Sequence, residues 1–296
     1  MIATNSVLKT TVFTLFALIA FAANSVLCRL ALAEDAIDAA SFTLLRLFSG
    51  IVVLLLILAL SGGKQSRSGT GSWFSGIMLF LYAIAFSFAY ISLDTATGAL
   101  ILFAAVQVTM IFKHLVAGNR LHYTEWLGLS IAFAGFVYLV LPGATAPSIS
   151  GFLLMGAAGI AWAIYTLRGR GSVNPLADTA YNFVRTTPFV IVLALLAIPT
   201  MQLSTEGVLL ALLSGGLASG TGYALWYVVL KTLSTTEAAV VQLFVPVIAA
   251  VGGIIFVSEA VTQRLLFSGL MILGGILILV LARYCFVPYD VQEERS

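Results

Sequence analysis

The stretch AASFTLLRLFSGIVVLLLILAL, which runs from Ala39 to Leu60, decides the class of fold. It carries one charged residue, Arg46, and is otherwise almost entirely apolar. A helix needs about 20 mainly apolar residues to cross the hydrocarbon core of a bilayer. Because the apolar residues form one block and do not alternate with polar ones, the stretch predicts a membrane-spanning helix and not a strand of an outer-membrane barrel.

The composition of the whole chain agrees with that interpretation. Of the 296 residues, 61% are hydrophobic and 9% are charged, whereas about 25% are charged in a typical soluble domain. The 14 Lys and Arg and the 12 Asp and Glu residues are too few to cover the surface of a soluble enzyme. The hydrophobicity also excludes a disordered chain. The net charge of +2 gives no indication of nucleic-acid binding.

Segments of this kind follow one another along the chain, and we expect an all-α membrane protein with ten transmembrane helices. The first is interpreted as a span and not as a cleaved signal peptide, because its apolar run is too long for one. The ten segments lie near residues 11–32, 39–60, 71–91, 95–113, 122–141, 149–168, 177–198, 207–229, 234–256 and 263–285.

The basic residues predict how these helices are oriented. Lys and Arg are enriched in short cytoplasmic loops of membrane proteins. If the N-terminus is cytoplasmic, the inner ends hold Lys9, Lys64, Arg67, Lys113, Arg120, Arg168, Arg170, Lys231, Arg283 and Arg295. The outer ends then hold fewer basic residues, namely Arg29, Arg46 and Arg264. The bias predicts a multi-pass protein of the cytoplasmic (inner) membrane with both termini in the cytoplasm.

The chain contains a weak internal repeat at a shift of 139 residues. Arg29 then matches Arg168, and Arg46 in ASFTLLR matches Arg185 in TAYNFVR. We therefore predict two units, residues 1–145 and 146–296, with five spans each. Because five is odd, the second unit would enter the bilayer from the opposite side, which is an inverted repeat typical of secondary transporters. Chance similarity between apolar segments is the alternative.

The stretch LKTLSTTEAAVVQLFVPVIAA, residues 230–250, and the exit VSEA, residues 257–260, carry a resemblance to a known family. With LDTATGAL at residues 93–100, they resemble the EamA-type pattern of the drug/metabolite transporter (DMT) superfamily, and the resemblance extends over essentially the whole chain. The first half departs from the pattern where Gln107 stands opposite Pro246 and where Asn119 replaces the exit Glu.

The resemblance implies transport of a small molecule across the cytoplasmic membrane, usually as efflux. The chain is similar to bacterial exporters of amino acids, including exporters of aromatic amino acids. We expect a carrier that works by alternating access and functions as a monomer. An efflux carrier for drugs or organic cations is the first alternative, and a channel or membrane receptor is the second. We find no catalytic, ATP-binding or metal-binding motif, and we expect neither an enzyme nor a cofactor.

Polar and aromatic residues near the middle of the spans are the candidate binding residues. Polar side chains are costly in lipid and are therefore expected to face the interior. Amide groups can bind both an amino and a carboxylate group, and aromatic faces suit apolar side chains or cations. Packing between helices is the alternative role for each of them. The candidates are Asn24, Tyr82, Gln107, Trp162, Tyr165, Tyr223, Trp226 and Gln242.

Three further residues are candidates for a gate or a hinge. Arg46 and Arg185 lie inside their spans, where they anchor gates or hold helix ends, unless they reach an interface by snorkelling. The structural role is favoured for both. Pro246 lacks a backbone N–H, so it produces either a hinge or a rigid kink.

The acidic residues are predicted to avoid the middle of the membrane. A buried carboxylate relay for protons is therefore not expected. If transport is coupled to protons, Asp94 or Glu237 near a gate would have to bind and release the proton. A facilitative carrier, which needs no such residue, fits the sequence equally well.

Overall fold

The computed structural model describes residues 2–33, 35–61, 69–118, 121–143, 146–169, 172–230, 232–233 and 235–286. Over these residues the regular structure is helical, apart from one isolated antiparallel bridge between Ile37 and Leu203. Several residues used above lie outside the described residues: Lys64, Arg67, Asn119, Arg120, Arg170, Lys231 and Arg295.

The first half forms five uninterrupted helices that follow the predicted segments. They are α1 (Ile2–Ala33), α2 (Ala39–Leu60), α3 (Trp73–Ala89), α4 (Thr95–Val116) and α5 (Tyr123–Val140). The main difference is that α1 begins before the apolar run does.

The helices of the second half are interrupted, which the hydropathy did not predict. After α6 (Ile149–Gly169), the seventh segment divides into α7 (Pro175–Val184), α8 (Thr187–Ala197) and the short helix η1 (Ile198–Thr200). The eighth divides into α9 (Thr205–Leu213), the π-helix η2 (Ser214–Thr221) and α10 (Gly222–Leu230), and the ninth into α11 (Thr235–Gln242) and α12 (Phe244–Phe256). The tenth segment, like the sixth, is continuous, as α13 (Gln263–Phe286).

Two of these interruptions have a covalent cause. Pro188 is the second residue of α8 and Pro246 the third of α12. Neither can donate the backbone hydrogen bond to the residue four positions earlier, Val184 and Gln242 respectively. The preceding helices, α7 and α11, therefore end at Val184 and Gln242, four residues before the prolines.

Among the described residues, eight helices are long and apolar enough to cross a membrane. Two shorter apolar helices, Trp73–Ala89 and Val240–Phe256, accompany them. A chain with this many apolar helices is a multi-pass membrane protein. The total of ten crossings and the inverted repeat stay predictions.

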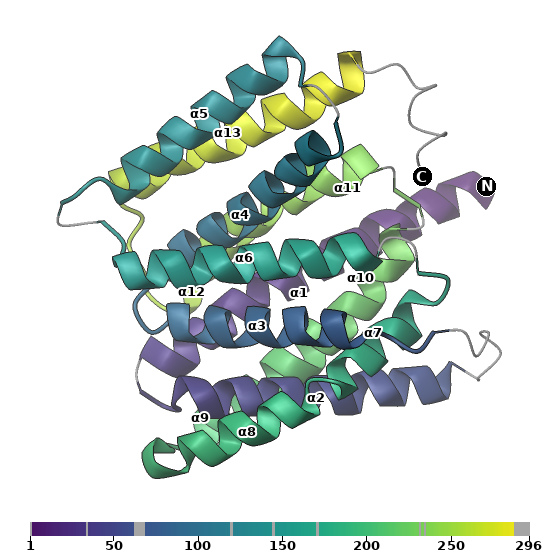
Figure 1. Ribbon diagram of the computed structural model, residues 1–296, viewed down its shortest axis with the longest axis vertical. Helices are drawn as coiled ribbons and strands as arrows, with labels where there is room; N and C mark the ends of the chain where they lie inside the picture. Colours follow the sequence, from purple (N-terminus) through teal and green to yellow (C-terminus); the bar gives the residue numbers. More distant parts are fainter. Residues whose placement is uncertain are drawn as a thin grey trace.

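The helices run side by side between two ends of the bundle (Figure 1). At one end α1 begins, α2 ends, α3 begins and α13 ends; we call it the terminal end. At the opposite end, the distal end, α1 and α3 finish and α2 and α4 start. The pair α5 and α13 lies along one edge of the bundle. A Cβ atom on Gly128 of α5 would lie 2.5 Å from the carbonyl oxygen of Gly275 of α13, so these two backbones approach closely.

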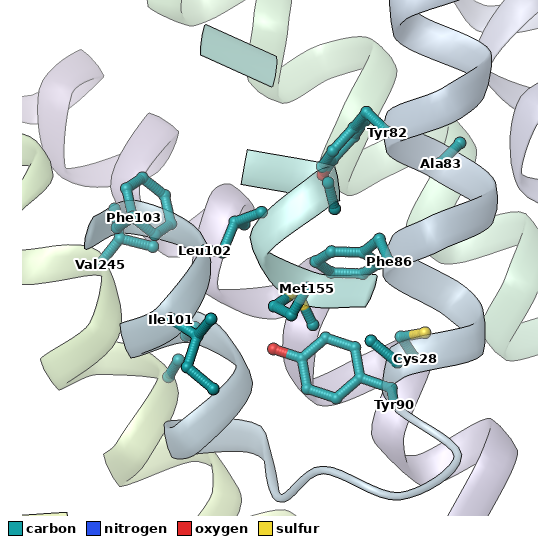
Figure 2. Packing of buried hydrophobic residues seen from close by; sticks show 14 of the residues in the cluster. Cys28, Tyr82, Ala83, Phe86, Tyr90, Ile101, Leu102, Phe103, Met155 and Val245 are labelled. Carbon is teal, nitrogen blue, oxygen red and sulfur yellow. The ribbon is translucent and has the colours of Figure 1, made fainter. Parts of the chain in front are cut away.

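An aromatic face of α3 forms part of the core (Figure 2). Tyr82, Phe86 and Tyr90 follow one another at four-residue spacing and project to the same side of the helix. Their ring centroids are 5.5 Å and 4.8 Å apart. Met155 of α6 and Ile101 of α4 lie among them, which joins three helices of the bundle.

Candidate functional site

Rings from four helices meet in the interior, and Trp162 of α6 lies at their centre. Its ring centroid is 5.0 Å from Tyr82 of α3, 5.0 Å from Tyr223 of α10, 5.5 Å from Tyr165 and 6.5 Å from Phe21 of α1. Phe21 in turn lies 5.7 Å from Trp226 of α10. We call Phe21, Tyr82, Trp162, Tyr165, Tyr223 and Trp226 the aromatic cluster.

Helical spacing explains how the sequence builds this cluster. Trp162 and Tyr165 are three residues apart on α6, as are Tyr223 and Trp226 on α10, so each pair shares one face of its helix. The structure thus brings together five predicted binding residues from distant parts of the chain. Phe21 was not predicted, because a phenylalanine in an apolar helix looks the same in the sequence whether it faces lipid or the interior.

Arg46 is buried beside this cluster and does not reach an interface. The residue is 2% exposed, and its Nη2 donates a hydrogen bond to the Tyr82 hydroxyl at 2.9 Å. The guanidinium carbon lies 4.6 Å from the ring centroid of Phe86 and 5.2 Å from that of Tyr82. Its Nη1 is buried without a hydrogen-bond partner. Among the described residues, no carboxylate lies within 4.0 Å of it.

The backbone of η2 lies directly on α2 at Arg46. A Cβ atom on Gly215 would lie 1.9 Å from the Arg46 carbonyl oxygen and 2.1 Å from the Ser49 Oγ. On Gly216 or Gly220 it would lie 3.1 Å from Val53. The Gly-x-x-x-Gly pair at Gly216 and Gly220 therefore faces α2, but the closest approach is at Gly215, one residue before the motif.

Asn24 connects α1 to the same π-helix. The residue is 3% exposed, and its Oδ1 accepts hydrogen bonds from the Ser214 Oγ at 2.8 Å and from the Ser219 Oγ at 3.2 Å. Both hydroxyls belong to η2, in which an extra residue per turn shifts the positions of the side chains. The side-chain carbonyl of Asn24 thus holds α1 against η2.

The other predicted residues lie on helices outside the aromatic cluster. Gln107 is buried on α4, Gln242 is half-buried at the last position of α11, and Pro246 is buried on α12. Arg185 caps the C-terminus of α7, where its Nη1 donates to the Tyr181 carbonyl at 3.2 Å and its guanidinium lies 5.8 Å from the Trp73 ring. Of the two arginines matched by the repeat, Arg46 is buried inside and Arg185 holds a helix end.

The distal end has a charged contact between the two halves. Both carboxylate oxygens of Glu259, which follows α12, accept the Thr95 backbone N–H at 2.9 Å, and Oε1 also accepts from the Thr95 hydroxyl at 3.0 Å. Arg29 of α1 pairs with Glu259 at 3.3 Å and with Asp94 at 3.7 Å. Asp94 is the N-cap residue of α4 but makes no capping bond itself, so Glu259 caps that helix from the other half.

A strained residue precedes this glutamate. Ser258 has a φ of 57°, in the left-handed region that glycine adopts without strain. A glycine would suit this position better than the serine does.

We expect Glu259→Ala to lower the free energy of unfolding by about 2 kcal/mol, the upper range for losing a helix cap. The cause is the loss of the acceptor for the Thr95 N–H, together with an unpaired Arg29. Thermal denaturation of purified protein in detergent measures the change. Glu206→Ala is the matched control, because Glu206 also lies at the distal end, in the first turn of α9, but is exposed. Equal shifts for both variants would contradict the capping role.

Hydrogen bonds between loops also join the two halves at both ends. At the distal end, the Asp38 carboxylate accepts the Ser41 N–H at 2.9 Å and the Gln202 N–H at 3.0 Å. Partial burial acts to raise the pKa of the Asp38 carboxyl, but these hydrogen bonds outweigh it and hold the pKa below its ordinary value. At the terminal end, the Asp178 carboxylate accepts the Gly71 N–H at 2.8 Å.

The chain was compared with known proteins. A profile of the EamA-like transporter family matches residues 8–141 and residues 149–281. "Uncharacterized protein PA1977" of Pseudomonas aeruginosa is 46% identical over 275 residues, which cover 93% of this chain and 96% of that protein. An "Uncharacterized transporter" of Archaeoglobus fulgidus is 29% identical over 68% of this chain and 72% of its own length. A solved structure described as "Crystal structure of protein" shares the fold, with a TM-score of 0.60 at 21% identity over 90% of this chain and 98% of that chain.

Proposed function

We propose that this chain, which belongs to the EamA-like transporter family, exports amino acids or related small metabolites across the cytoplasmic membrane by alternating access. Membership of the family makes it a membrane transporter of small molecules. The substrate, the direction of transport and the mechanism are our proposal, as are the inner-membrane location with both termini in the cytoplasm and function as a monomer.

The aromatic cluster is the observation that carries this proposal. Its rings come from α1 and α3 of the first half and from α6 and α10 of the second, so a substrate held there lies between the halves. Substrate sites of inverted-repeat carriers lie in that position. Trp162, Tyr165, Tyr223, Trp226 and Tyr82 would bind the apolar part of the substrate through their faces. Asn24 supports the site by holding η2.

The loop contacts at the two ends support alternating access. Asp38 and Asp178 lie at matching places, just after the first helix of each half, and each accepts a backbone N–H from a loop of the other half. Under the predicted repeat of residues 1–145 and 146–296, the two contacts are equivalents on opposite sides of the membrane. The separate matches of the family profile to residues 8–141 and 149–281 also support two repeats. Opening one side would require breaking one contact and keeping the other.

The outlying candidates take part in this opening and not in binding. Pro246 and the break before it form the hinge of the ninth span, with Gln242 at the end of α11 carrying the carbonyl that lacks its helical donor. Arg185 caps the end of α7, and Gln107 lies on α4 at the position that the predicted repeat matches with Pro246.

Counterflow in proteoliposomes tests the proposal. Purified full-length protein is loaded with one unlabelled compound and exposed to the labelled form, with and without a pH gradient, over a panel of amino acids and organic cations. We expect accumulation of at least one amino acid above empty liposomes, because a carrier shows trans-acceleration. A channel or receptor gives none. If no panel compound accumulates, or only organic cations do, the proposal is wrong. The pH gradient separates proton-coupled from facilitative transport.

A further inference from the structure

The interior of this transporter contains a positive charge, Arg46, for which the described side chains supply no counter-ion. Arg46 is 2% exposed, and its Nη1 is buried without a hydrogen-bond partner. The groups that interact electrostatically with its guanidinium are Tyr82, Tyr223 and Cys28, which are ordinarily neutral at pH 7. A buried charge with incomplete pairing is unfavourable, so an anion at Nη1 would be stabilised strongly.

Four of the described carboxylates have partners at the two ends of the bundle. Glu259, Asp94 and Asp38 lie at the distal end, where they bind Arg29, Thr95 and Gln202, and Asp178 binds Gly71 at the terminal end. No described carboxylate pairs with Arg46, so a substrate that carries a carboxylate could supply its counter-ion.

Arg46 also lies next to the proposed binding rings. Its Nη2 donates to the Tyr82 hydroxyl at 2.9 Å, and the Tyr82 ring lies 5.0 Å from Trp162. An anion at Nη1 would thus have the aromatic cluster beside it. Guanidinium presents its N–H groups as a planar fork that matches the two oxygens of a carboxylate.

We propose that Arg46 binds the carboxylate of the substrate while the aromatic cluster holds its apolar or aromatic side chain. This inference rests on the proposed function and narrows it. The substrate class is monocarboxylates with an apolar or aromatic group, including amino acids and their deaminated analogues. Organic cations without a carboxylate are excluded, because the same positive charge repels them.

A set of analogues on the wild-type protein tests the assignment. Phenylalanine, 3-phenylpropionate, which lacks the ammonium group, and phenethylamine, which lacks the carboxylate, form one series. Leucine, 4-methylpentanoate and isopentylamine form a second. Binding to the purified full chain is measured by the ligand-dependent rise in denaturation temperature. We expect the amines to bind at least about thirtyfold more weakly than the carboxylates of the same series, the loss typical of an unpaired buried charge.

Variants then assign the effect to Arg46. Arg46→Met should reduce carboxylate binding by about thirtyfold or more and bring the preference over the amine close to one. Arg46→Lys, which keeps the charge but loses the planar fork, should retain a partial preference. Arg168→Gln is the control, because Arg168 is exposed at the end of α6 and its loss removes the same charge.

The outcomes are decisive in each direction. Equal binding of amines and carboxylates by the wild type, or no carboxylate binding in either series, would overturn the assignment even if Arg46→Met failed to fold. A merely structural Arg46 predicts that folded Arg46→Lys has the wild-type preference. If carboxylates bind selectively but no counterflow occurs, the transport proposal fails and the carboxylate site stands. If counterflow occurs equally with the amines, the carboxylate site alone fails.

Discussion

Gly215→Ala is expected to destabilise the protein more than any other single methyl group that could be added to η2. The new Cβ would lie 1.9 Å from the Arg46 carbonyl oxygen and 2.1 Å from the Ser49 Oγ. The first of these atoms belongs to backbone, which cannot move without displacing α2. Overpacking of a core costs about 1–3 kcal/mol and more where backbone must shift. We expect a loss of about 3 kcal/mol, which lowers Tm by roughly 10 °C.

Thermal denaturation in detergent, followed by size-exclusion chromatography, measures this loss. Gly156→Ala on α6 is the matched control, because nothing lies within 4 Å of a Cβ added there. Gly216→Ala should fall between the two, since its Cβ would lie 3.1 Å from the Val53 side chain and no nearer than 3.9 Å to Ser49. If Gly215→Ala denatures at the same temperature as Gly156→Ala, η2 does not lie as close to α2 as described.

Trp162→Ala is expected to have the largest effect on transport. The substitution removes the ring that contacts Tyr82, Tyr165 and Tyr223 at centroid distances of 5.0 Å, 5.5 Å and 5.0 Å. Aromatic pairs contribute about 0.5–1.5 kcal/mol each beyond the area they bury. If that energy serves to hold the substrate, the three pairs together correspond to a drop of at least about tenfold in counterflow per incorporated protein.

The control distinguishes the site from a general effect of losing a tryptophan. Trp126 on α5 is 52% exposed, so Trp126→Ala should leave transport close to the wild-type rate. Trp162→Phe keeps a ring and should retain part of the activity. Normal transport by Trp162→Ala, with the protein expressed and extracted as the wild type is, would show that the aromatic cluster does not bind the substrate.

The helices of the first half could be predicted well because hydropathy reports the length of an apolar segment directly. The interruptions of the second half could not, since Pro188 and the glycines of η2 barely change an average over 20 residues. Pro246 was predicted to produce a hinge or a rigid kink, and α11 ends at Gln242, four residues before it. Hydropathy thus locates spans but not the backbone hydrogen bonds inside them.

The environment of each polar residue was harder to predict. From the sequence, Arg46 and Arg185 have the same character, and snorkelling was open to both; only the packing of η2 on α2 places Arg46 inside. The acidic residues were predicted only to avoid the middle of the membrane, and Thr95, the partner of Glu259, is 164 residues away from it. No pattern within one helix reveals such a contact. Phe21 was missed for the same reason, because burial among rings depends on three other helices.

The interruptions of the second half also determine where water can go. A helix break in a bilayer leaves carbonyl groups that only protein or solvent can satisfy. The breaks at Pro188 and Pro246 and the π-helix η2 all lie between α6 and α13, whereas the described helices of the first half are continuous. We therefore expect water in the interior to lie along the helices of the second half and to be absent from those of the first half. A polar solute that crosses this protein would then replace its bound water with backbone carbonyl groups of the second half only.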